Sequence, residues 1–360
     1  MKSDFLILGG GIAGISAAAS LSELGQVTLL EAEAHFAHHA SGRSAALYEP
    51  FYGLGPVVAL SHASGDYLRT ANGGVLSPRG MMIVAGRDER AAFDKDIAVM
   101  DLAEISLDEA RAHMPILRPE TVQYAGWADH AWDIDTDLLI QNFLRQARAN
   151  GALAETGARA TQITRTADGW QVLTAKGSFE GRVLVNAAGA WVDEVAQLAG
   201  IASPGFTPMR RSMARIPAPG GHDVSRWPMV FGVGETWYCK PDAGALIVSP
   251  AEEHPMQPHD AWADDMVLAE GLARYEERVT EPVTRLLSSW AGLRTFSPDR
   301  VPLIGFAPGR PDYFWLAGQG GYGFQSAPAA SVLVADLIGG RAPSMDAATI
   351  KALSPSRFSL

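Results

Sequence analysis

The chain has 360 residues, a net charge of −11 at neutral pH and one cysteine, Cys239. Hydrophobic residues make up 47% of it, which supports a sizeable core, and the length predicts two domains or one domain with an insertion. The acidic balance without basic clusters argues against nucleic acids and anionic membrane surfaces as partners. A single cysteine excludes a disulfide framework and fits a reducing compartment, so we expect a cytoplasmic protein without a transmembrane segment.

The first thirty residues predict a strand, a glycine turn, a helix and a second strand. An apolar run at 5–8 leads into G-G-G-I-A-G, apolar residues at helical spacing follow as far as Gly25, and a second apolar run ends before Glu31. Asp4 ahead of the first run favours a strand over a signal peptide. In this arrangement a helix N-terminus receives the phosphates of a dinucleotide cofactor.

The residue types of this turn fit that use. Gly9 permits the tight turn, Gly11 lets the backbone approach a pyrophosphate, and Gly14 lets the helix lie close to the sheet. Glu31, at the end of the second strand, is placed to accept hydrogen bonds from a ribose diol. These residues alone leave NAD and FAD open as the cofactor.

The following segment, H-F-A-H-H-A-S-G-R-S-A-A at 35–46, holds three histidines. His35, His38 and His39 share no fixed spacing on one face of an element, so we expect no metal site there. The small residues in the second half of the segment allow backbone N–H groups to approach a cofactor closely.

Four motifs in chain order carry a resemblance to a known family. They are S-G-R-S-A-A at 41–46, L-V-N-A-A-G-A-W at 184–191, S-P-D-R-V-P-L-I-G at 297–305 and Q-G-G-Y-G-F-Q at 319–325. With these motifs the chain resembles the D-amino acid oxidase family of FAD-dependent amine oxidoreductases over nearly its full length. Within that family, R-R-S, W-P-M, Y-x-K-P-D-A-G and W-A-G-L-R make it most similar to the bacterial D-arginine dehydrogenases.

The resemblance implies a mixed α/β fold, in which a Rossmann-like FAD-binding domain of the glutathione reductase type carries an inserted mixed-sheet substrate domain. We expect residues 1–75, 131–205 and 294–360 to form the discontinuous FAD-binding domain. Residues 76–130 and 206–293 are then expected to form the substrate-binding domain.

Within this scaffold the local patterns predict several elements. Asp135 or Asp137 is expected to cap a helix that ends at Gly151, rather than to bind a metal. Strands are expected over 158–164, 169–175 and 181–186, and a helix with one apolar face is expected to follow the glycine cluster near 320–323.

The resemblance also implies FAD as a noncovalent cofactor, because nothing in the motif around Cys239 supports covalent attachment. The contacts it implies are Gly9, Gly11, Ile12, Ala13, Gly14, Glu31, Ala32, Ser41, Gly42, Arg43, Ser44, Ala45, Ala46, Ala188, Gly189, Trp191, Gly320, Gly321, Tyr322, Gly323, Phe324 and Gln325.

Arg294, in W-A-G-L-R, is the strongest candidate for a substrate-binding residue. No acid lies within four positions of it on either side, and a buried guanidinium needs an anion. The resemblance implies that Arg294 holds the α-carboxylate of a substrate and that the Tyr238 hydroxyl shares it. Arg211 is implied as a helper and Tyr52 as a loop residue near the substrate entrance.

The remaining pocket residues distinguish this chain from its relatives. The resemblance implies that the Gly321 carbonyl accepts from the substrate amine and that Gln325 lies nearby. Met81 stands where the D-arginine enzymes have a guanidinium-binding glutamate, and Leu47 stands where they have a histidine near the amine. Phe231 replaces a smaller aliphatic residue.

Together with Met229, these replacements predict an apolar pocket, and therefore a neutral or hydrophobic substrate side chain. Glu49 is the acid that would accommodate a cationic side chain instead.

The expected reaction is oxidation of a D-amino acid by hydride transfer from Cα to flavin N5. The imino acid then hydrolyses to a 2-oxo acid and ammonia. Two alternatives remain open: an oxidase or dehydrogenase of glycine-like, N-methylated or cyclic secondary amino acids, and a flavin-binding ligand sensor without turnover. The electron acceptor, whether oxygen, a quinone or an electron-transfer protein, is equally open.

Overall fold

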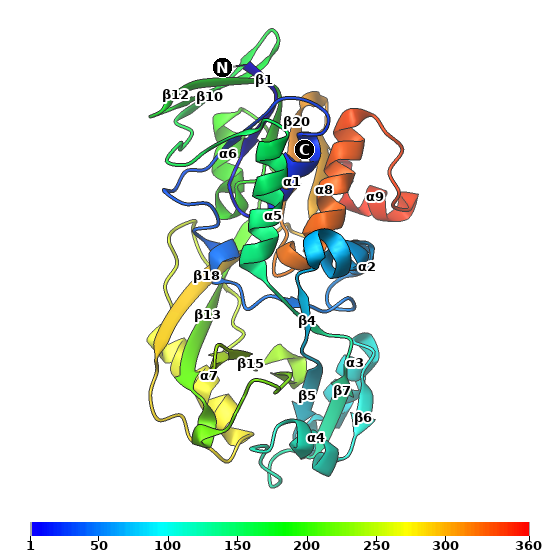
Figure 1. Ribbon diagram of the computed structural model, residues 1–360, viewed down its shortest axis with the longest axis vertical. Helices are drawn as coiled ribbons and strands as arrows, with labels where there is room; N and C mark the ends of the chain where they lie inside the picture. Colours follow the sequence, from blue (N-terminus) through cyan, green and yellow to red (C-terminus); the bar gives the residue numbers. More distant parts are fainter. Residues whose placement is uncertain (1, 360) are drawn as a thin grey trace.

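The computed structural model describes residues 2–359 as two halves stacked along the long axis (Figure 1). An eight-stranded sheet forms the upper half and a nine-stranded sheet the lower half, and a small three-stranded sheet is the third sheet of the chain. The mixed α/β fold predicted from the sequence is confirmed.

The upper sheet has a parallel centre. Strands β9, β2, β1, β12 and β20 lie side by side in parallel, while β10, β11 and β19 pair antiparallel at its edges. Their bounds are β1 Lys2–Leu8, β2 Val27–Leu30, β9 Leu153–Glu155, β10 Gln162–Thr166, β11 Gly169–Thr174, β12 Gly177–Asn186, β19 Leu303–Ala307 and β20 Arg310–Ala317.

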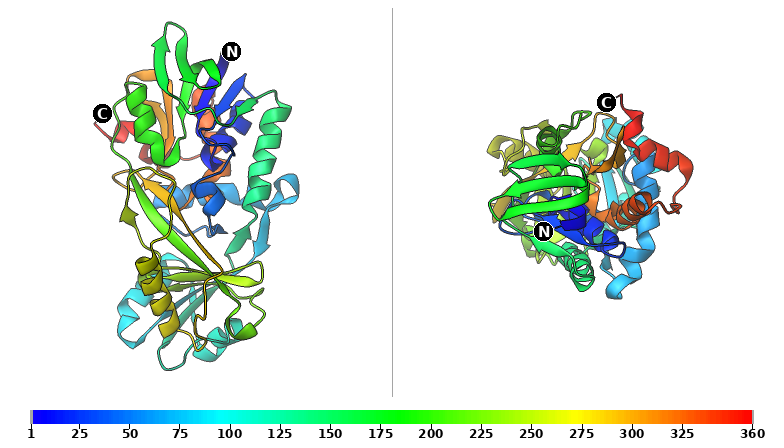
Figure 2. Two further views of the ribbon diagram at one scale, coloured as in Figure 1. Left: turned by 90° about the vertical axis from the view of Figure 1, so that its left-hand side faces the viewer. Right: turned by 90° about the horizontal axis from the view of Figure 1, so that it is seen from above.

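Alternate residues of β1 serve two separate cores. Phe5 and Ile7 pack against a layer of helices, whereas Leu6 and Leu8 pack against α6 and the β10–β11 hairpin on the other face. Figure 2 shows the helical layer and the meander on opposite sides of the sheet when the molecule is seen from above. The bounds are α1 Ile12–Leu21, α2 Gly55–Thr70, α5 Thr136–Ala149, α6 Val192–Leu198, α8 Gly323–Gly339 and α9 Ala347–Leu353.

The lower sheet runs in the order β17-β13-β16-β15-β14-β5-β7-β6, and β18 pairs with β13. Its strands are β5 Met81–Ala85, β6 Ala103–Ile105, β7 Tyr124–Ala128, β13 Thr207–Pro217, β14 Met229–Gly232, β15 Tyr238–Asp242, β16 Ala245–Ser249, β17 His254–Pro255 and β18 Ser288–Phe296. Helices α3 Arg90–Val99, α4 Leu107–His113 and α7 Asp265–Glu277 accompany it.

The long antiparallel pair β13–β18 belongs to the lower sheet and extends from the junction of the two halves into the lower half, as Figures 1 and 2 show. Its nine paired positions extend from Thr207 opposite Phe296 to Arg215 opposite Ser288. The third sheet is formed by β3 Leu47–Tyr48, β8 Trp132–Ile134 and β4 Leu76–Pro78.

Local predictions agree with these elements except at some boundaries. Asp135 caps α5 by accepting from the Leu138 amide at 2.9 Å, as predicted. Helix α1 ends at Leu21 rather than near Gly25, and the Ser22 hydroxyl donates to the Ala19 carbonyl at this end. The strand expected from residue 158 begins only at Gln162, while α2 and α7 were not anticipated.

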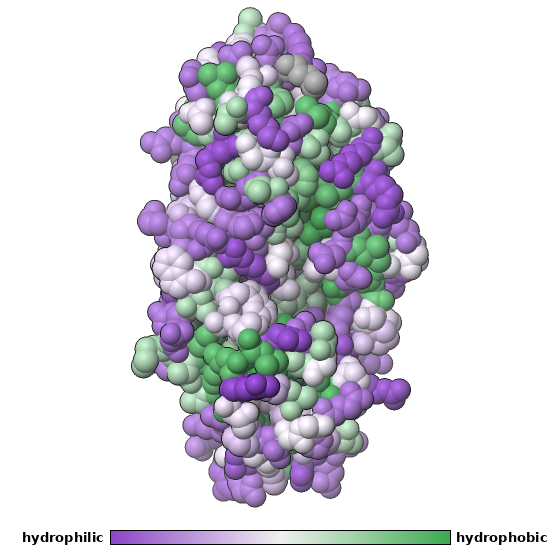
Figure 3. All heavy atoms as spheres, turned by 60° about the vertical axis from the view of Figure 1, so that its left-hand side comes forward, coloured by the Kyte–Doolittle hydropathy of each residue, from purple (hydrophilic) through white to green (hydrophobic). Residues whose placement is uncertain are grey.

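No helix within residues 2–359 combines the length and the apolar character that crossing a membrane requires. The face drawn in Figure 3 is largely hydrophilic, with hydrophobic atoms gathered in separate patches.

Candidate functional site

Three adjoining cavities lead from the glycine turn in the upper half to the lower sheet. The dinucleotide groove is lined by Gly9, Glu31 and Trp191 among others. The middle cavity shares Gly11 and Ser41 with the groove. The distal cavity shares three residues with the middle cavity, Ser44, Arg294 and Gly321.

The glycine turn is closely packed at two positions. Gly9 has a φ of +112°, and a Cβ there would lie 2.2 Å from the Ala187 carbonyl oxygen. A Cβ on Gly14 would lie 1.9 Å from the Gly9 carbonyl oxygen, so the helix meets the turn backbone to backbone. The absence of a Cβ at both positions lets α1, the turn and the end of β12 lie in direct contact.

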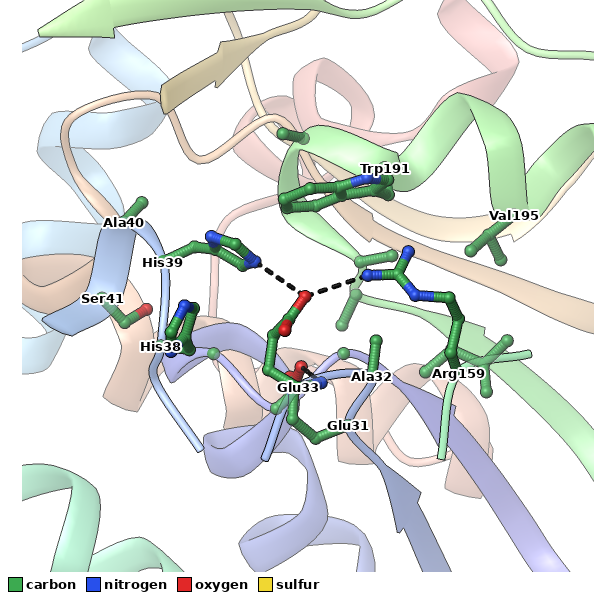
Figure 4. A pocket seen from close by; sticks show the side chains of 18 of the residues that line it. Glu31, Ala32, Glu33, His38, His39, Ala40, Ser41, Arg159, Trp191 and Val195 are labelled. Atoms are coloured by element: carbon green, nitrogen blue, oxygen red, sulfur yellow. Dashed lines mark hydrogen bonds and ion pairs between the residues drawn. The ribbon is translucent and has the colours of Figure 1, made fainter. Parts of the chain in front are cut away.

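Acidic side chains cluster in the groove, as Figure 4 shows. Glu31 accepts from the Gly10 amide at 2.6 Å and from the Glu33 amide at 2.7 Å, so both of its oxygens already hold backbone N–H groups. Glu33, which the sequence analysis did not single out, accepts from Arg159 at 2.9 Å and lies 3.2 Å from His39 Nε2. The Trp191 ring lies across the groove from Glu33.

Possible ligand atoms of Glu33, His38 and His39 all lie within 4.8 Å of one another. Burial lowers the pKa of His39, against the opposing effect of Glu33. Because these residues line the same groove as the glycine turn, we assign them to the dinucleotide end of the site.

The loop 40–46 is fixed to β18. Arg43 donates to the Ala291 carbonyl at 3.0 Å and to the Ala261 carbonyl at 2.9 Å, and the Trp290 indole donates to the Arg43 carbonyl at 3.0 Å. The Ser41 hydroxyl accepts from the Ile12 amide at 3.0 Å. Arg43 lines the groove, but its guanidinium mainly locks the loop in place.

Lys240 fixes the end of the same loop and was missed by the sequence analysis. It is buried, and its Nζ donates to the Ala45 carbonyl at 2.8 Å and the Ala46 carbonyl at 3.0 Å. Its charge is paired with Asp133 at 2.7 Å. Burial lowers the pKa of Lys240, and Asp133 opposes this effect.

Strand register brings the predicted pocket residues together. On β13–β18, Arg211 is paired opposite Gly292, two positions from Arg294, so both arginines lie on one face of the strand pair. On the neighbouring strands Met229 is paired with Met81 and Phe231 with Tyr238. All of them except Arg211 line the distal cavity, and Arg211 lines the middle cavity.

Arg294 has a side chain 20% exposed, and its Nη1 lies 3.8 Å from Glu235 Oε1. Burial acts to lower its pKa, but Tyr52, Tyr238 and Glu235 outweigh this and the pKa is raised, so the guanidinium stays charged. A Cβ on Gly321 would lie 2.9 Å from Nη1, which shows how closely this backbone approaches the arginine.

Glu235 is the acid of this site that the sequence did not reveal. It accepts from the Tyr52 hydroxyl at 2.9 Å and pairs with Arg211 at 2.8 Å. Its φ of +55° follows one of +67° at Gly234, so a tight left-handed turn aims it. Arg211 also lies 3.3 Å from Glu253 and is therefore held by two carboxylates, whereas Arg294 has Glu235 alone at 3.8 Å. Arg294 is the more available cation.

Two further predicted residues have defined partners. The Tyr238 hydroxyl is buried, and its hydrogen-bond contact among the described residues is a weak one, to Met213 Sδ at 3.7 Å. Gln325 accepts from the Glu49 amide at 3.1 Å and donates to the Tyr52 carbonyl at 3.2 Å. Gln325 thus ties the start of α8 to the loop that follows β3.

Most predicted residues line one of the three cavities, but some do not. Leu47, Tyr52 and Gln325 line the distal cavity, and so does Glu49, which the sequence indicated as an acid close to the pocket. Met100 and Glu235 also line it and were not in the predicted set. Three predicted cofactor contacts, Gly14, Gly42 and Tyr322, line none of the three cavities. A Cβ on Gly42 would instead meet the Ala37 carbonyl at 2.3 Å, and the Tyr322 ring packs against Tyr52.

Cys239 lies away from these cavities. It packs with Val230 and Leu246 in a core cluster separate from the one that contains Tyr238. Burial raises the pKa of its thiol. The position fits a structural residue rather than an attachment point for a cofactor.

Comparison with known proteins adds the family. Residues 4–337 match the family model described as FAD dependent oxidoreductase. The chain is 27% identical, over 98% of its length, to the tRNA 5-methylaminomethyl-2-thiouridine biosynthesis bifunctional protein of Thiobacillus denitrificans, of which it spans 59%. It is 25% identical to N-methyl-L-tryptophan oxidase of Salmonella agona, with 100% of this chain and 99% of that protein covered.

Among solved structures, L-proline dehydrogenase from P. horikoshii superposes with a TM-score of 0.84 at 23% identity, covering 99% of this chain and 98% of that one. This likeness shows a shared fold.

The groove and the middle cavity fit FAD. The α1 N-terminus and the glycine turn that a Cβ would fill suit the pyrophosphate, and a Cβ on Gly11 would come within 3.1 Å of Ser41 Oγ. Gly320, Gly321 and Gly323, at the start of the 17-residue helix α8, line the middle cavity, where the flavin ring would meet backbone.

Proposed function

This chain belongs to the family of FAD-dependent oxidoreductases that act on amino or amine groups, and we propose that within it the protein oxidises a D-amino acid with a neutral or hydrophobic side chain. The product would be an imino acid that water converts to a 2-oxo acid and ammonia. The observation that carries the proposal is Arg294, a charged and incompletely neutralised guanidinium in a cavity that has one apolar wall.

Arg294 would hold the substrate carboxylate by two parallel hydrogen bonds, because a planar guanidinium matches a carboxylate in geometry. The Tyr238 hydroxyl, which has only a sulfur contact, is available as a further donor. Positioning the reacting Cα beside its acceptor can lower the free-energy barrier of the reaction by on the order of 7–11 kcal/mol. When FAD is bound, its flavin ring supplies the acceptor for the hydride that leaves Cα.

The side-chain preference follows from the distal cavity. Met81, Met100, Met229 and Phe231 form an apolar wall. A cationic side chain against that wall would be desolvated, which costs several kcal/mol unless an acid pairs with it. Two acids line the cavity, and one of them, Glu235, is already bound by Tyr52 and Arg211. D-Leu, D-Met and D-Phe should therefore be better substrates than D-Arg or D-Lys.

A second candidate is an N-methylated amino acid. The full-length similarity to N-methyl-L-tryptophan oxidase favours it, and the apolar wall suits a methylated amine as well as a primary one. In this case Arg294 would keep the same role. The two candidate substrates would then be distinguished by the substituent on the amine nitrogen.

The deciding experiment mixes the purified yellow protein anaerobically with D-, L- and N-methyl amino acids and follows bleaching of the flavin absorbance. We expect the fastest bleaching with D-Leu, D-Met or D-Phe. Faster bleaching by D-Arg or D-Lys contradicts the side-chain assignment. Faster bleaching by L- or N-methyl amino acids means that one of these classes, and not a primary D-amino acid, is the substrate. Flavin that no amino acid reduces would support a ligand sensor instead.

A further inference from the structure

Glu49 has a buried carboxylate with one unused oxygen. The residue is 2% exposed, follows β3 directly and lines the distal cavity. Its Oε1 accepts from the Phe51 amide at 3.1 Å, whereas Oε2 has no hydrogen-bond partner within residues 2–359. An unpaired buried carboxylate oxygen is costly, so a hydrogen-bond donor that reached Oε2 would be bound favourably.

The backbone of Glu49 is held firmly. Its amide donates to Gln325 Oε1 at 3.1 Å, and its carbonyl accepts from the Tyr52 amide at 3.1 Å. Gln325 lines the distal cavity as well. The unpaired Oε2 therefore belongs to a side chain whose backbone is fixed to the wall of the cavity.

His130 provides the connection to the surface. Its Nε2 lies 3.1 Å from Glu49 Oε1, and its side chain is 25% exposed against 3% for that of Glu49. The contact with Glu49 raises the pKa of His130, although burial opposes this. The pair thus extends from the cavity wall to a histidine whose side chain is partly exposed.

The cavity then presents two unlike charges that the chain itself leaves incompletely satisfied. Arg294 is the available cation, and Glu49 is the acid with a free oxygen, because Glu235 is already bound by Tyr52 and Arg211. An α-amino acid carries one carboxylate and one ammonium group. The match assigns the carboxylate to Arg294 and the ammonium to Glu49.

On the basis of the proposed function, we propose that Glu49 binds the α-ammonium group of the amino acid and takes its proton, while His130 releases a proton to solvent. An N–H bond of the ammonium breaks, its electron pair stays on nitrogen, and an O–H bond forms at Glu49 Oε2. The imidazolium of His130, no longer paired with an anion, loses one N–H proton to water.

The charges balance in this step. The pair is an ion pair before it and neutral after it, and one proton in total reaches solvent. A neutral pair suits a desolvated cavity better than an isolated charge would. The substrate is left as the neutral amine, the form whose nitrogen lone pair is free to support oxidation at Cα.

Other titratable and charged groups lie around the Glu49–His130 pair and contribute to the electrostatic potential there. Asp101 and Asp129 act on His130, Tyr48 lies next to Glu49 in sequence, and Tyr52, Glu235 and Arg294 line the cavity. The Glu49 and His130 variants below leave all of these groups in place.

The test compares two ligands of nearly the same shape on the FAD-loaded protein. 2-Aminoisobutyrate has no hydrogen on Cα and so cannot be oxidised, and pivalate carries a methyl group in place of its ammonium. Isothermal titration calorimetry in buffers of different ionisation enthalpy measures proton release. At about pH 6, where His130 is protonated, we expect about one proton released per 2-aminoisobutyrate and none per pivalate.

Three variants separate the roles. Glu49→Gln should abolish proton release and lose about tenfold or more of the preference for 2-aminoisobutyrate over pivalate. His130→Gln should keep the preference but lose the release. His62→Gln is the matched control, because His62 also packs against Phe51, whereas the histidine paired with Glu49 is His130. This variant should behave as the unmodified protein.

Proton release that survives in Glu49→Gln overturns the inference, and so does an unchanged preference for the amine. Suppose that amino acids bleach the flavin, and that the pH profile of bleaching in the Glu49→Gln and His130→Gln variants is the same as in the unmodified protein. The inference then fails while the proposed function stands. If no amino acid bleaches the flavin, both fail together. FAD content confirms that each variant is folded.

Discussion

The dinucleotide groove and the distal cavity are built in different ways. The groove is shaped by backbone: glycines that admit no Cβ, a helix N-terminus and a loop locked onto β18. The distal cavity is shaped by side chains from β5, β14, β15, β18, α8 and the loop after β3, brought together by strand register. Backbone construction suits a constant cofactor, and side-chain construction suits a substrate that differs between relatives.

The two regions also differ in how far their charged side chains are satisfied by the protein itself. In the groove, Glu31 is occupied by two backbone amides. In the distal cavity, Arg294 and Glu49 each keep capacity for a ligand. Three of the predictions below alter one region at a time and test whether the two are independent, and the other alters the connection between them.

The largest effect is expected from Arg294→Met. Loss of a desolvated charged anchor costs about 2–5 kcal/mol, so kcat/KM should fall by about 10³-fold while FAD content is unchanged. Rapid-mixing flavin reduction measures the first quantity and absorbance the second. Arg215→Met is the control on β13, since Arg215 pairs with Asp242 and lines none of the three cavities. Equal reduction rates in the two variants would remove Arg294 from the site.

Gly9→Ala is expected to weaken FAD binding, the property that Arg294→Met leaves unchanged. A φ of +112° and a carbonyl 2.2 Å from the new Cβ impose strain of roughly 1–3 kcal/mol or more, so FAD affinity should fall about tenfold to hundredfold. The flavin-to-protein ratio after gel filtration measures this. Gly309→Ala has a φ of +68° with open space around it and should keep its flavin. Full FAD content in Gly9→Ala would contradict the assignment of the groove.

A smaller effect on stability is expected from Lys240→Met, which alters the connection between the two regions. The Ala45 and Ala46 carbonyls lose their donor, but Asp133 retains Arg79, so unfolding free energy should fall by about 2 kcal/mol. Urea denaturation of the FAD-loaded protein is the measurement. Lys176→Met, which removes an exposed pair with Glu155, should change it by less than about 0.5 kcal/mol. A similar loss in both variants would count against a special role for Lys240.

The smallest effect is expected from Met81→Glu. A carboxylate in the apolar wall gives a cationic side chain a partner, so the ratio of kcat/KM for D-Lys to that for D-Met should rise about tenfold. Steady-state rates measure the ratio. Met81→Gln has nearly the same size without the charge and should leave the ratio unchanged, and an unchanged ratio in both would show that Met81 does not face the substrate side chain.

The sequence predicts those parts of the site that depend on local backbone. The glycine turn, the loop at 41–46 and the glycine cluster at 320–323 are contiguous motifs, and the structure brings most of their residues to the cavities. Helix α5 and its Asp135 cap are predicted for the same reason, since a cap needs only its own next three residues.

The missed residues depend on contacts between distant segments. Glu235 reaches Tyr52 and Arg211 because two successive residues adopt positive φ, which no residue pattern in V-G-E-T-W indicates. Lys240 is different, because a lysine in the apolar strand Y-C-K-P-D carried a readable signal. The reasoning that singled out Arg294, a charge among apolar residues, applies in part to Lys240, although Asp242 lies two positions away.

The β13–β18 pair has a consequence for how a ligand enters. Nine consecutive paired positions form a stiff strut within the lower sheet, and the same strut carries Arg294 and holds the loop at 40–46. A wide opening of one half against the other would have to break the hydrogen bonds between this strut and the loop. Access should therefore depend on displacement of the short segment around Tyr52, and small-angle scattering curves of the ligand-free and ligand-bound protein should superimpose.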